Sequence, residues 1–126
     1  MSTTKKCVLD VGNCGPDHAA IVRLLRPFNC DVLQADDARG ALDALKSGGI
    51  DLVLVNRKLD VDYSDGIEVI RQIKADPAVA ATPVMLVTNY PEHQDAAEAI
   101  GALRGFGKLE FAKPETRERL AAVLGA

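Results

Sequence analysis

The sequence predicts an α/β fold, a doubly wound parallel sheet with helices on both faces. Short apolar runs without polar alternation, at residues 52–55 and 84–87, are typical of strands buried on both faces. Between such runs lie stretches whose apolar residues recur at helical spacing. Strands and helices that alternate in this way form right-handed crossovers and therefore a parallel sheet.

The composition limits the class of protein. The 126 residues are 48% hydrophobic and suit one domain over 1–126, with its core at about 5–124. The formal net charge of -3 argues against direct nucleic-acid binding. No apolar run approaches the roughly 20 residues of a membrane span, and the polar start lacks the apolar core of a signal peptide. We therefore expect a cytoplasmic protein that does not bind membranes.

The three cysteines, Cys7, Cys14 and Cys30, form no Cys-x-x-Cys pair and have no histidine at metal-ligand spacing. Reduced thiols that are buried or partly buried are therefore expected. Cys14 is also a candidate redox-sensing thiol.

The first half of the chain predicts three strands and two helices. The strands are expected at residues 7–11, 31–35 and 51–56. The first helix follows a turn-rich loop, ends near Pro27, and buries an apolar face made of Ile21, Leu24, Leu25 and Phe28. Asp36 or Asp37 should cap the second helix, which the glycines at 48–49 stop.

The second half predicts two strands and three helices. A loop at 57–65 leads to a helix that buries its isoleucines and ends at Asp76, before a proline. A strand at 84–88 and a polar helix at 92–100 follow. The glycines of 101–107 predict a loop, and the fifth strand is expected at 109–112. Pro114 suits the first position of the last helix.

Polar residues follow the strands where each one should leave the core. These residues are Asn13 and Cys14 after strand one, Asn56 in strand three, Thr88 in strand four and Lys113 after strand five. Because carboxyl ends of parallel strands share one edge, we expect these side chains to lie at a common crevice. Asp51 should lie at the opposite edge, and His18 is expected to be exposed.

Over essentially its whole length the chain resembles a response-regulator receiver domain. Five features carry the resemblance: the run 51–56 with Leu59 three residues on; Asp65-Gly66 opening a helix; the run 83–88; Lys113-Pro114 before the last helix; and Pro16-Asp17-His18 at the start of the first. The resemblance implies a flavodoxin-like (CheY-like) sheet of order 2-1-3-4-5 with five helices. It also implies a cis bond at Lys113-Pro114 and a role in two-component phosphorelay signal transduction.

The family's chemistry moves a phosphoryl group from a histidine kinase to an aspartate at the end of strand three. An acidic pair after strand one holds Mg²⁺, which prefers hard oxygen ligands. In this chain the phosphoacceptor position holds Asn56, whose neutral amide cannot form an acyl phosphate. Asn13 and Cys14 stand at the acidic-pair positions, or Gly12 and Asn13 if the loop carries one extra residue. We therefore expect no cofactor, no metal ligand, no catalytic residue and weak or absent Mg²⁺ binding.

Two phosphate-site residues of the family are retained, namely Thr88 and Lys113. Without nearby carboxylates, Lys113 should bond Asn56, Asp10 or a loop carbonyl, or turn to solvent. Glu110 stands three residues before Lys113, where the family usually has an aromatic side chain that switches rotamer. The loops before strand five and after Asn56 are longer than is usual in the family.

These departures favour a pseudo-receiver, a regulatory or interaction module that is not an enzyme. Protein partners are expected at the face of the fourth helix, the fifth strand and the last helix, including residues 103–108 and 117–119, which could also support a homodimer. One alternative is an active receiver phosphorylated at a displaced acid, such as Asp10 or the group Asp60, Asp62 and Asp65. Another is an unrelated ligand-binding flavodoxin-like domain.

Overall fold

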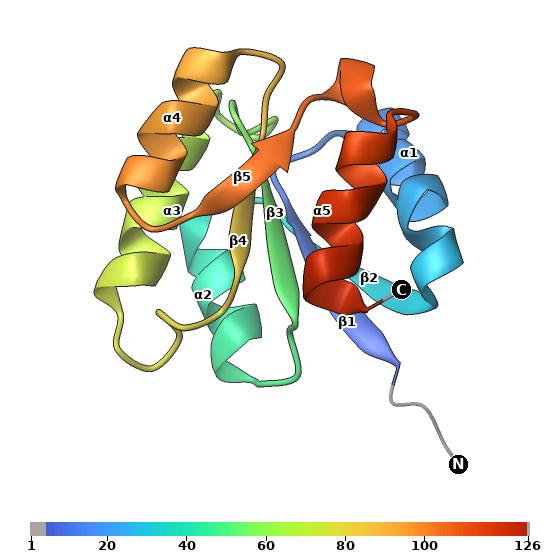
Figure 1. Ribbon diagram of the computed structural model, residues 1–126. Coiled ribbons are helices and arrows are strands. Elements are labelled where there is room, and N and C mark those ends of the chain that lie inside the picture. Colours follow the sequence, from blue (N-terminus) through green and yellow to red (C-terminus); the bar gives the residue numbers. More distant parts are fainter. Residues whose placement is uncertain (1–4, 126) are drawn as a thin grey trace.

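A computed structural model describes residues 5–125 and places five parallel strands in one sheet (Figure 1). The strand order is β2-β1-β3-β4-β5, so the predicted fold class and strand order are confirmed. The strands are β1 (Lys6–Val11), β2 (Cys30–Ala35), β3 (Leu52–Asn56), β4 (Val84–Val87) and β5 (Leu103–Phe106).

Five α-helices cover the two faces of the sheet (Figure 1). They are α1 (Gly15–Leu25), α2 (Ala38–Lys46), α3 (Gly66–Ala75), α4 (Pro91–Ala99) and α5 (Pro114–Leu124). Helices α1 and α5 pack on one face, whereas α2, α3 and α4 pack on the other. Two short 3-10 helices, η1 (Arg26–Phe28) and η2 (Lys108–Glu110), join these elements.

Strand β3 explains why its apolar run shows no alternation. Leu52 and Leu54 pack with α1 and α5, whereas Val53 and Val55 pack with α2 and α3. All four side chains are fully buried, because a central parallel strand has helices on both sides. The polar residue Asn56 is the first of the strand to leave this double layer.

Helix ends follow the signals in the sequence. Asp37 caps α2 by accepting a hydrogen bond from Gly40 N at 2.8 Å. Asp65 caps α3 in the same way through Ile67 N at 2.9 Å. Pro114 opens α5 as predicted, where its missing N–H leaves no helical bond unmade. At the opposite edge of the sheet, Asp51 accepts a bond from Cys7 N at 2.8 Å.

The predicted position of the fifth strand is wrong. Strand β5 runs through the glycine-rich stretch that was expected to be a loop, and the predicted strand 109–112 begins within η2. Gly105 is needed in β5 because an added Cβ would overlap the Leu86 carbonyl oxygen of β4. Gln94 of α4 then accepts a bond from Gly105 N and donates one to Leu86 O, at 2.8 and 2.9 Å. A tertiary contact thus outweighs the low strand propensity of glycine.

Other expectations are also corrected. Within residues 5–125 no peptide bond is cis, so the expected cis bond at Lys113-Pro114 is absent. The bond lies instead between the N-cap and the first residue of α5. No helix in the described part of the chain is long and apolar enough to cross a bilayer.

Candidate functional site

The loops that leave β1, β3, β4 and β5 meet at the carboxyl edge of the sheet, at the top of Figure 1. Asn13 is almost completely buried there, and Cys14 is half-buried at the N-cap of α1. Asn56 ends β3, and Thr88 directly follows β4 with 7% of its surface exposed. These four residues therefore lie at the edge where the sequence places them.

Asn56 is bound to its own loop. Its Nδ2 donates a hydrogen bond of 2.6 Å to the carbonyl oxygen of Lys58, two residues further on. Its backbone carbonyl meets Gly66 so closely that any side chain at 66 would overlap it. The amide thus stabilises the turn that leaves β3, and it offers no carboxylate to a metal or a phosphoryl group.

The loop between β3 and α3 folds back over the end of β1. Leu59 is buried against Gly12, where an added Cβ would overlap the Leu59 side chain. The φ of +82° at Gly12 also favours glycine. Asp60 N donates a bond of 2.8 Å to Gly12 O, which fixes the two loops together. Asp60, Asp62 and Asp65 of this loop are exposed to solvent.

Asp10 lies inside the sheet and is fully buried. Strand β1 is flanked by β2 and β3, so Asp10 belongs to an inner strand of the sheet and not to an edge strand. Asn13 Nδ2 donates to one carboxylate oxygen at 2.5 Å, and His18 Nδ1 lies 2.6 Å from the other. His18 is therefore partly buried, with 22% of its side chain exposed, and not the free surface residue that was expected. A buried carboxylate requires such partners.

Lys108 lies closer to the end of β5 than Lys113 does. It is the second residue after β5, and its Nζ lies 2.6 Å from Asp17 Oδ2 in the first turn of α1. This ion pair lowers the pKa of the Asp17 carboxyl, chiefly through the hydrogen bond from Lys108 and partly offset by burial. Lys113 is the N-cap residue of α5 but makes no side-chain capping bond, and it is exposed, which matches the solvent-facing alternative. Three residues before Lys108 the chain has Gly105, so no aromatic side chain stands there.

Thr88 is hydrogen-bonded to residues that follow it in the loop and in α4. Its Oγ1 lies 3.3 Å from His93 Nδ1 and accepts a bond from Tyr90 N at 3.3 Å. In the same loop, Asn89 Oδ1 accepts a bond from Leu109 N at 3.0 Å. The loops after β4 and β5 are therefore joined to one another.

The donor atoms at this edge do not suit Mg²⁺. The buried carboxylate of Asp10 is already bound on both oxygens, and Asp17 is bound by a lysine. Among the buried side-chain atoms of residues 5–125, two have no hydrogen-bond partner: Asn13 Oδ1, a neutral acceptor, and Arg57 Nε, a donor. Among residues 5–125 no three His, Cys, Asp or Glu side chains form a group that could hold a metal ion. Mg²⁺ prefers carboxylate or phosphate oxygens, and the carboxylates of Asp10 and Asp17 at this edge already have protein partners.

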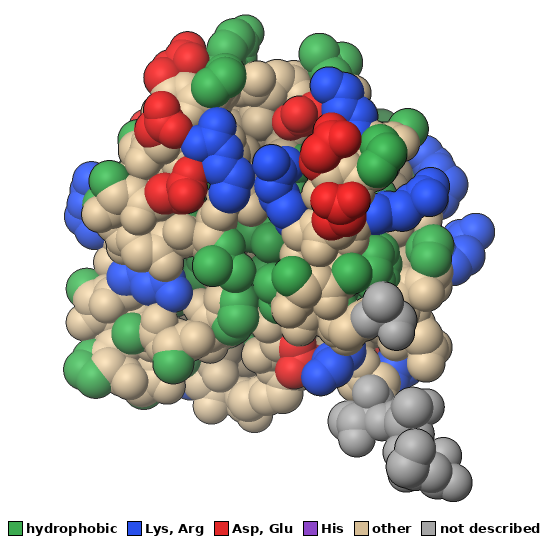
Figure 2. Space-filling model, in the orientation of Figure 1, with side chains coloured by type: hydrophobic (Ala, Val, Ile, Leu, Met, Phe, Trp, Pro, Cys, Tyr) green, Lys and Arg blue, Asp and Glu red, His purple; other side chains and the backbone are tan. Residues whose placement is uncertain are grey.

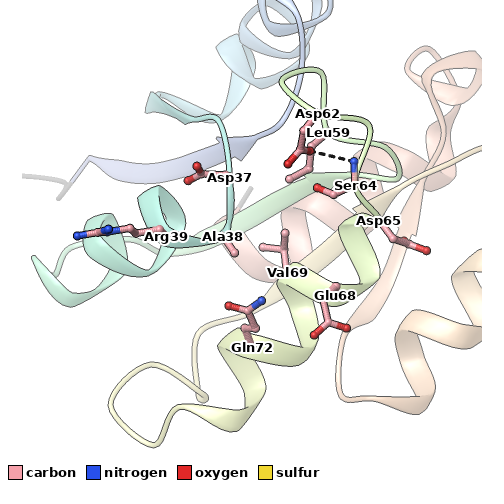
Figure 3. A pocket seen from close by; sticks show the side chains of 10 residues that line it. All are labelled: Asp37, Ala38, Arg39, Leu59, Asp62, Ser64, Asp65, Glu68, Val69 and Gln72. Atoms are coloured by element: carbon pink, nitrogen blue, oxygen red, sulfur yellow. Dashed lines mark hydrogen bonds between the residues drawn. The ribbon is translucent and has the colours of Figure 1, made fainter.

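A hollow of about 350 Å³ lies beside this edge, between the start of α2 and the start of α3 (Figure 3). Asp62, Asp65 and Glu68 line it, and so does Arg39 of α2. Asp62 accepts a bond from Ser64 N at 2.9 Å, and Asp65 caps α3. None of Asn13, Asn56, Thr88 and Lys108 lines this hollow, so it is a separate surface feature.

Sequence reasoning missed the pairs Asp10–His18 and Asp17–Lys108. The signal for the first pair was an acid inside an apolar strand, since a buried carboxylate implies a partner. The second pair joins residues 91 positions apart and depends on where β5 ends. No local pattern carries that information.

Residues 17–124 match the family model of the response regulator receiver domain. Similar solved structures include the chemotaxis protein CheY4 of Vibrio cholerae, with 23% identity, a TM-score of 0.77, and coverage of 96% of this chain and 100% of that one. A putative response regulator from Chloroflexus aurantiacus has 18% identity and a TM-score of 0.83, covering 98% and 100%. The receiver domain of a sensor histidine kinase from Pseudomonas aeruginosa, with magnesium coordinated in its active site cleft, has 19% identity and a TM-score of 0.78, covering 98% and 100%.

Proposed function

The chain belongs to the response regulator receiver domain family of two-component signalling, and on this premise we propose that it is a pseudo-receiver. It acts as a regulatory module that is not phosphorylated at Asn56 and catalyses no reaction. A cytoplasmic location is part of this proposal. The observation that carries it is the amide of Asn56 at the end of β3, bonded to its own loop at Lys58 O.

The missing metal ligands support the same proposal. Phosphoryl transfer to a carboxylate brings several negative charges together, which a divalent cation must neutralise. Asn13 and Cys14 offer an amide and a thiol after β1. Neither replaces the charge of two carboxylates.

The carboxylate of Asp17 supports the proposal that the domain has one functional state, which does not depend on phosphorylation. Asp17 engages the lysine that follows β5, so Lys108 already has an anionic partner in the unmodified protein. A phosphoryl group at Asn56 is not needed to hold the β5–α5 loop against α1. Regulation by abundance or by a partner fits this arrangement better than regulation by phosphate.

We propose the α4–β5–α5 face as the site of partner binding. Figure 2 shows apolar side chains in the middle of this face, with acidic and basic ones beside them. Leu103 of β5 is 44% exposed there, and Leu109, just beyond β5, is 82% exposed. Arg104 bridges to Asp95 and Glu98 of α4 at 2.6 and 2.8 Å, which fixes the charged border of the face. Such a border around an apolar centre suits a protein partner, or a second copy, better than a nucleic acid.

The proposal is tested by incubation with acetyl phosphate and Mg²⁺, read by intact mass. We expect no added phosphate on the wild-type chain. One added phosphate would reject the pseudo-receiver, and peptide mapping would then identify the displaced acid. A conventional receiver treated in parallel serves as the positive control.

A further inference from the structure

The loop between β3 and α3 carries an exposed segment that the proposed function does not use. Residues 60–63, Asp-Val-Asp-Tyr, are here called the acidic knob. Val61 is 59% exposed and Tyr63 is 74% exposed, and both carboxylates of the knob face solvent. The apolar side chains of Val61 and Tyr63 alternate with the carboxylates of Asp60 and Asp62, so the knob is a small amphipathic surface.

Hydrogen bonds within the loop brace the acidic knob. Tyr63 has a φ of +58°, which is rare for a residue with a bulky side chain. Its N–H donates to Leu59 O at 2.7 Å, and Leu59 N donates to Ser64 O at 2.9 Å. Asp62 accepts from Ser64 N at 2.9 Å, as Figure 3 shows. A loop braced by its own hydrogen bonds loses less conformational entropy on binding than an unbraced one.

A complementary groove lies elsewhere on the same chain. It has a volume of about 310 Å³ between α1 and the start of α5. Its floor and walls are apolar and include Leu24, Pro27 and Phe111, while Arg23 and Arg117 line it with positive charge. Within residues 5–125, neither arginine has an acidic partner within salt-bridge distance.

We propose that the acidic knob of one copy docks in the α1–α5 groove of a second copy. The knob offers two carboxylates and two apolar side chains, and the groove offers an apolar floor and two arginines that have no acidic partner among residues 5–125. The groove belongs to the α1–α5 face, whereas the knob leads into α3 on the opposite face of the sheet. A contact between two different surfaces joins copies head to tail, and it leaves a free knob and a free groove at the ends unless a ring closes.

Contact through a short loop buries little area, so weak self-association is expected, with a Kd of about 0.1–1 mM. Sedimentation equilibrium of the full chain tests this over about 0.02–2 mM at low salt. The weight-average mass should rise with concentration and continue beyond the dimer. Raising the salt to about 0.5 M should weaken the association several-fold, because charge pairs at the rim are screened.

Variants of the knob and the groove make the test specific. Tyr63→Ser, Asp60→Arg and Arg117→Glu should each weaken self-association about tenfold, because each removes an anchor or reverses a charge. The Asp60 side chain makes no hydrogen bond in the described structure, so its substitution leaves the loop intact. Tyr90→Ser is the matched control, since Tyr90 is also an exposed tyrosine, at 59%, but lies at the start of α4. An equimolar mixture of Asp60→Arg and Arg117→Glu chains should recover the wild-type association.

Several results would overturn the proposal. A chain that stays monomeric to about 2 mM has no such contact. Association that survives the knob and groove variants but is lost in Tyr90→Ser would use the α4–β5–α5 face. Loss of association in knob variants alone, with no recovery in the mixture, would show that another surface receives the knob. Phosphorylation assays are independent of these measurements, so failure here leaves the pseudo-receiver proposal standing.

Discussion

Substitution of Gly105 by alanine tests the unexpected position of β5. An added Cβ would overlap Leu86 O and lie 3.2 Å from both Leu86 N and Met85 Cβ. These atoms belong to β4, in the centre of the core, and cannot move aside as a flexible side chain would. Strands β4 and β5 must therefore separate, and the buried bond from Gly105 N to Gln94 Oε1 must lengthen.

The expected cost follows from these contacts. Overpacking of a close contact destabilises proteins by about 1–3 kcal/mol, and a weakened buried hydrogen bond adds about 1 kcal/mol. We expect Gly105→Ala to lower the free energy of unfolding by about 2–4 kcal/mol. For a chain of this size the midpoint of thermal unfolding should fall by about 10 °C.

Urea unfolding, followed by circular dichroism, measures the change. Gly15→Ala is the matched control, because an added Cβ at residue 15 meets no atom within 4 Å. Its effect should stay within about 0.5 kcal/mol, as should that of Leu109→Ala in the exposed η2. A loss below about 0.5 kcal/mol in Gly105→Ala, with a large loss in Leu109→Ala, would refute the placement of β5 and favour a strand at 109–112.

Three further predictions concern the carboxyl edge of the sheet. The Asn56→Asp variant should gain no phosphate from acetyl phosphate and Mg²⁺, whereas the triple variant that also carries Asn13→Asp and Cys14→Asp should be phosphorylated. Intact mass measures the added phosphate. Phosphorylation of the single variant would show that the acidic pair is dispensable. His18→Ala should lower the free energy of unfolding by about 1–3 kcal/mol, since it leaves a buried oxygen of Asp10 unpaired. The control His93→Ala should lower the free energy of unfolding by less. Equal losses in urea unfolding would argue against the Asp10 bond. The pKa of Asp17 is lowered by Lys108, so this pair stabilises the fold above the ordinary carboxyl pKa and its contribution disappears as the pH falls through the lowered value. The exposed pair is worth less than about 1 kcal/mol, so Asp17→Asn should remove a small part of the pH dependence of stability below about pH 4, and an unchanged pH profile would count against it.

The sequence by itself determined the fold class, the strand order through its family resemblance, and the most informative residue of the site. Unbroken apolar runs mark strands covered on both sides, and such runs place Asn56 where β3 leaves the core. Most helix ends followed from caps and prolines, whose effects are local. These features depend on neighbours within a few positions, which is why a single sequence reveals them.

Only the tertiary structure decided which lysine reaches the edge of the sheet. Glycine has low strand propensity, so residues 103–106 do not look like a strand until the backbone of β4 lies beside Gly105. Once β5 ends at Phe106, Lys108 meets Asp17 and Lys113 is left at the N-cap position of α5. Likewise, the bond between Asp10 and His18 exists because α1 packs over the end of a central strand. Contacts between distant segments depend on packing of the whole chain, and no local pattern encodes them.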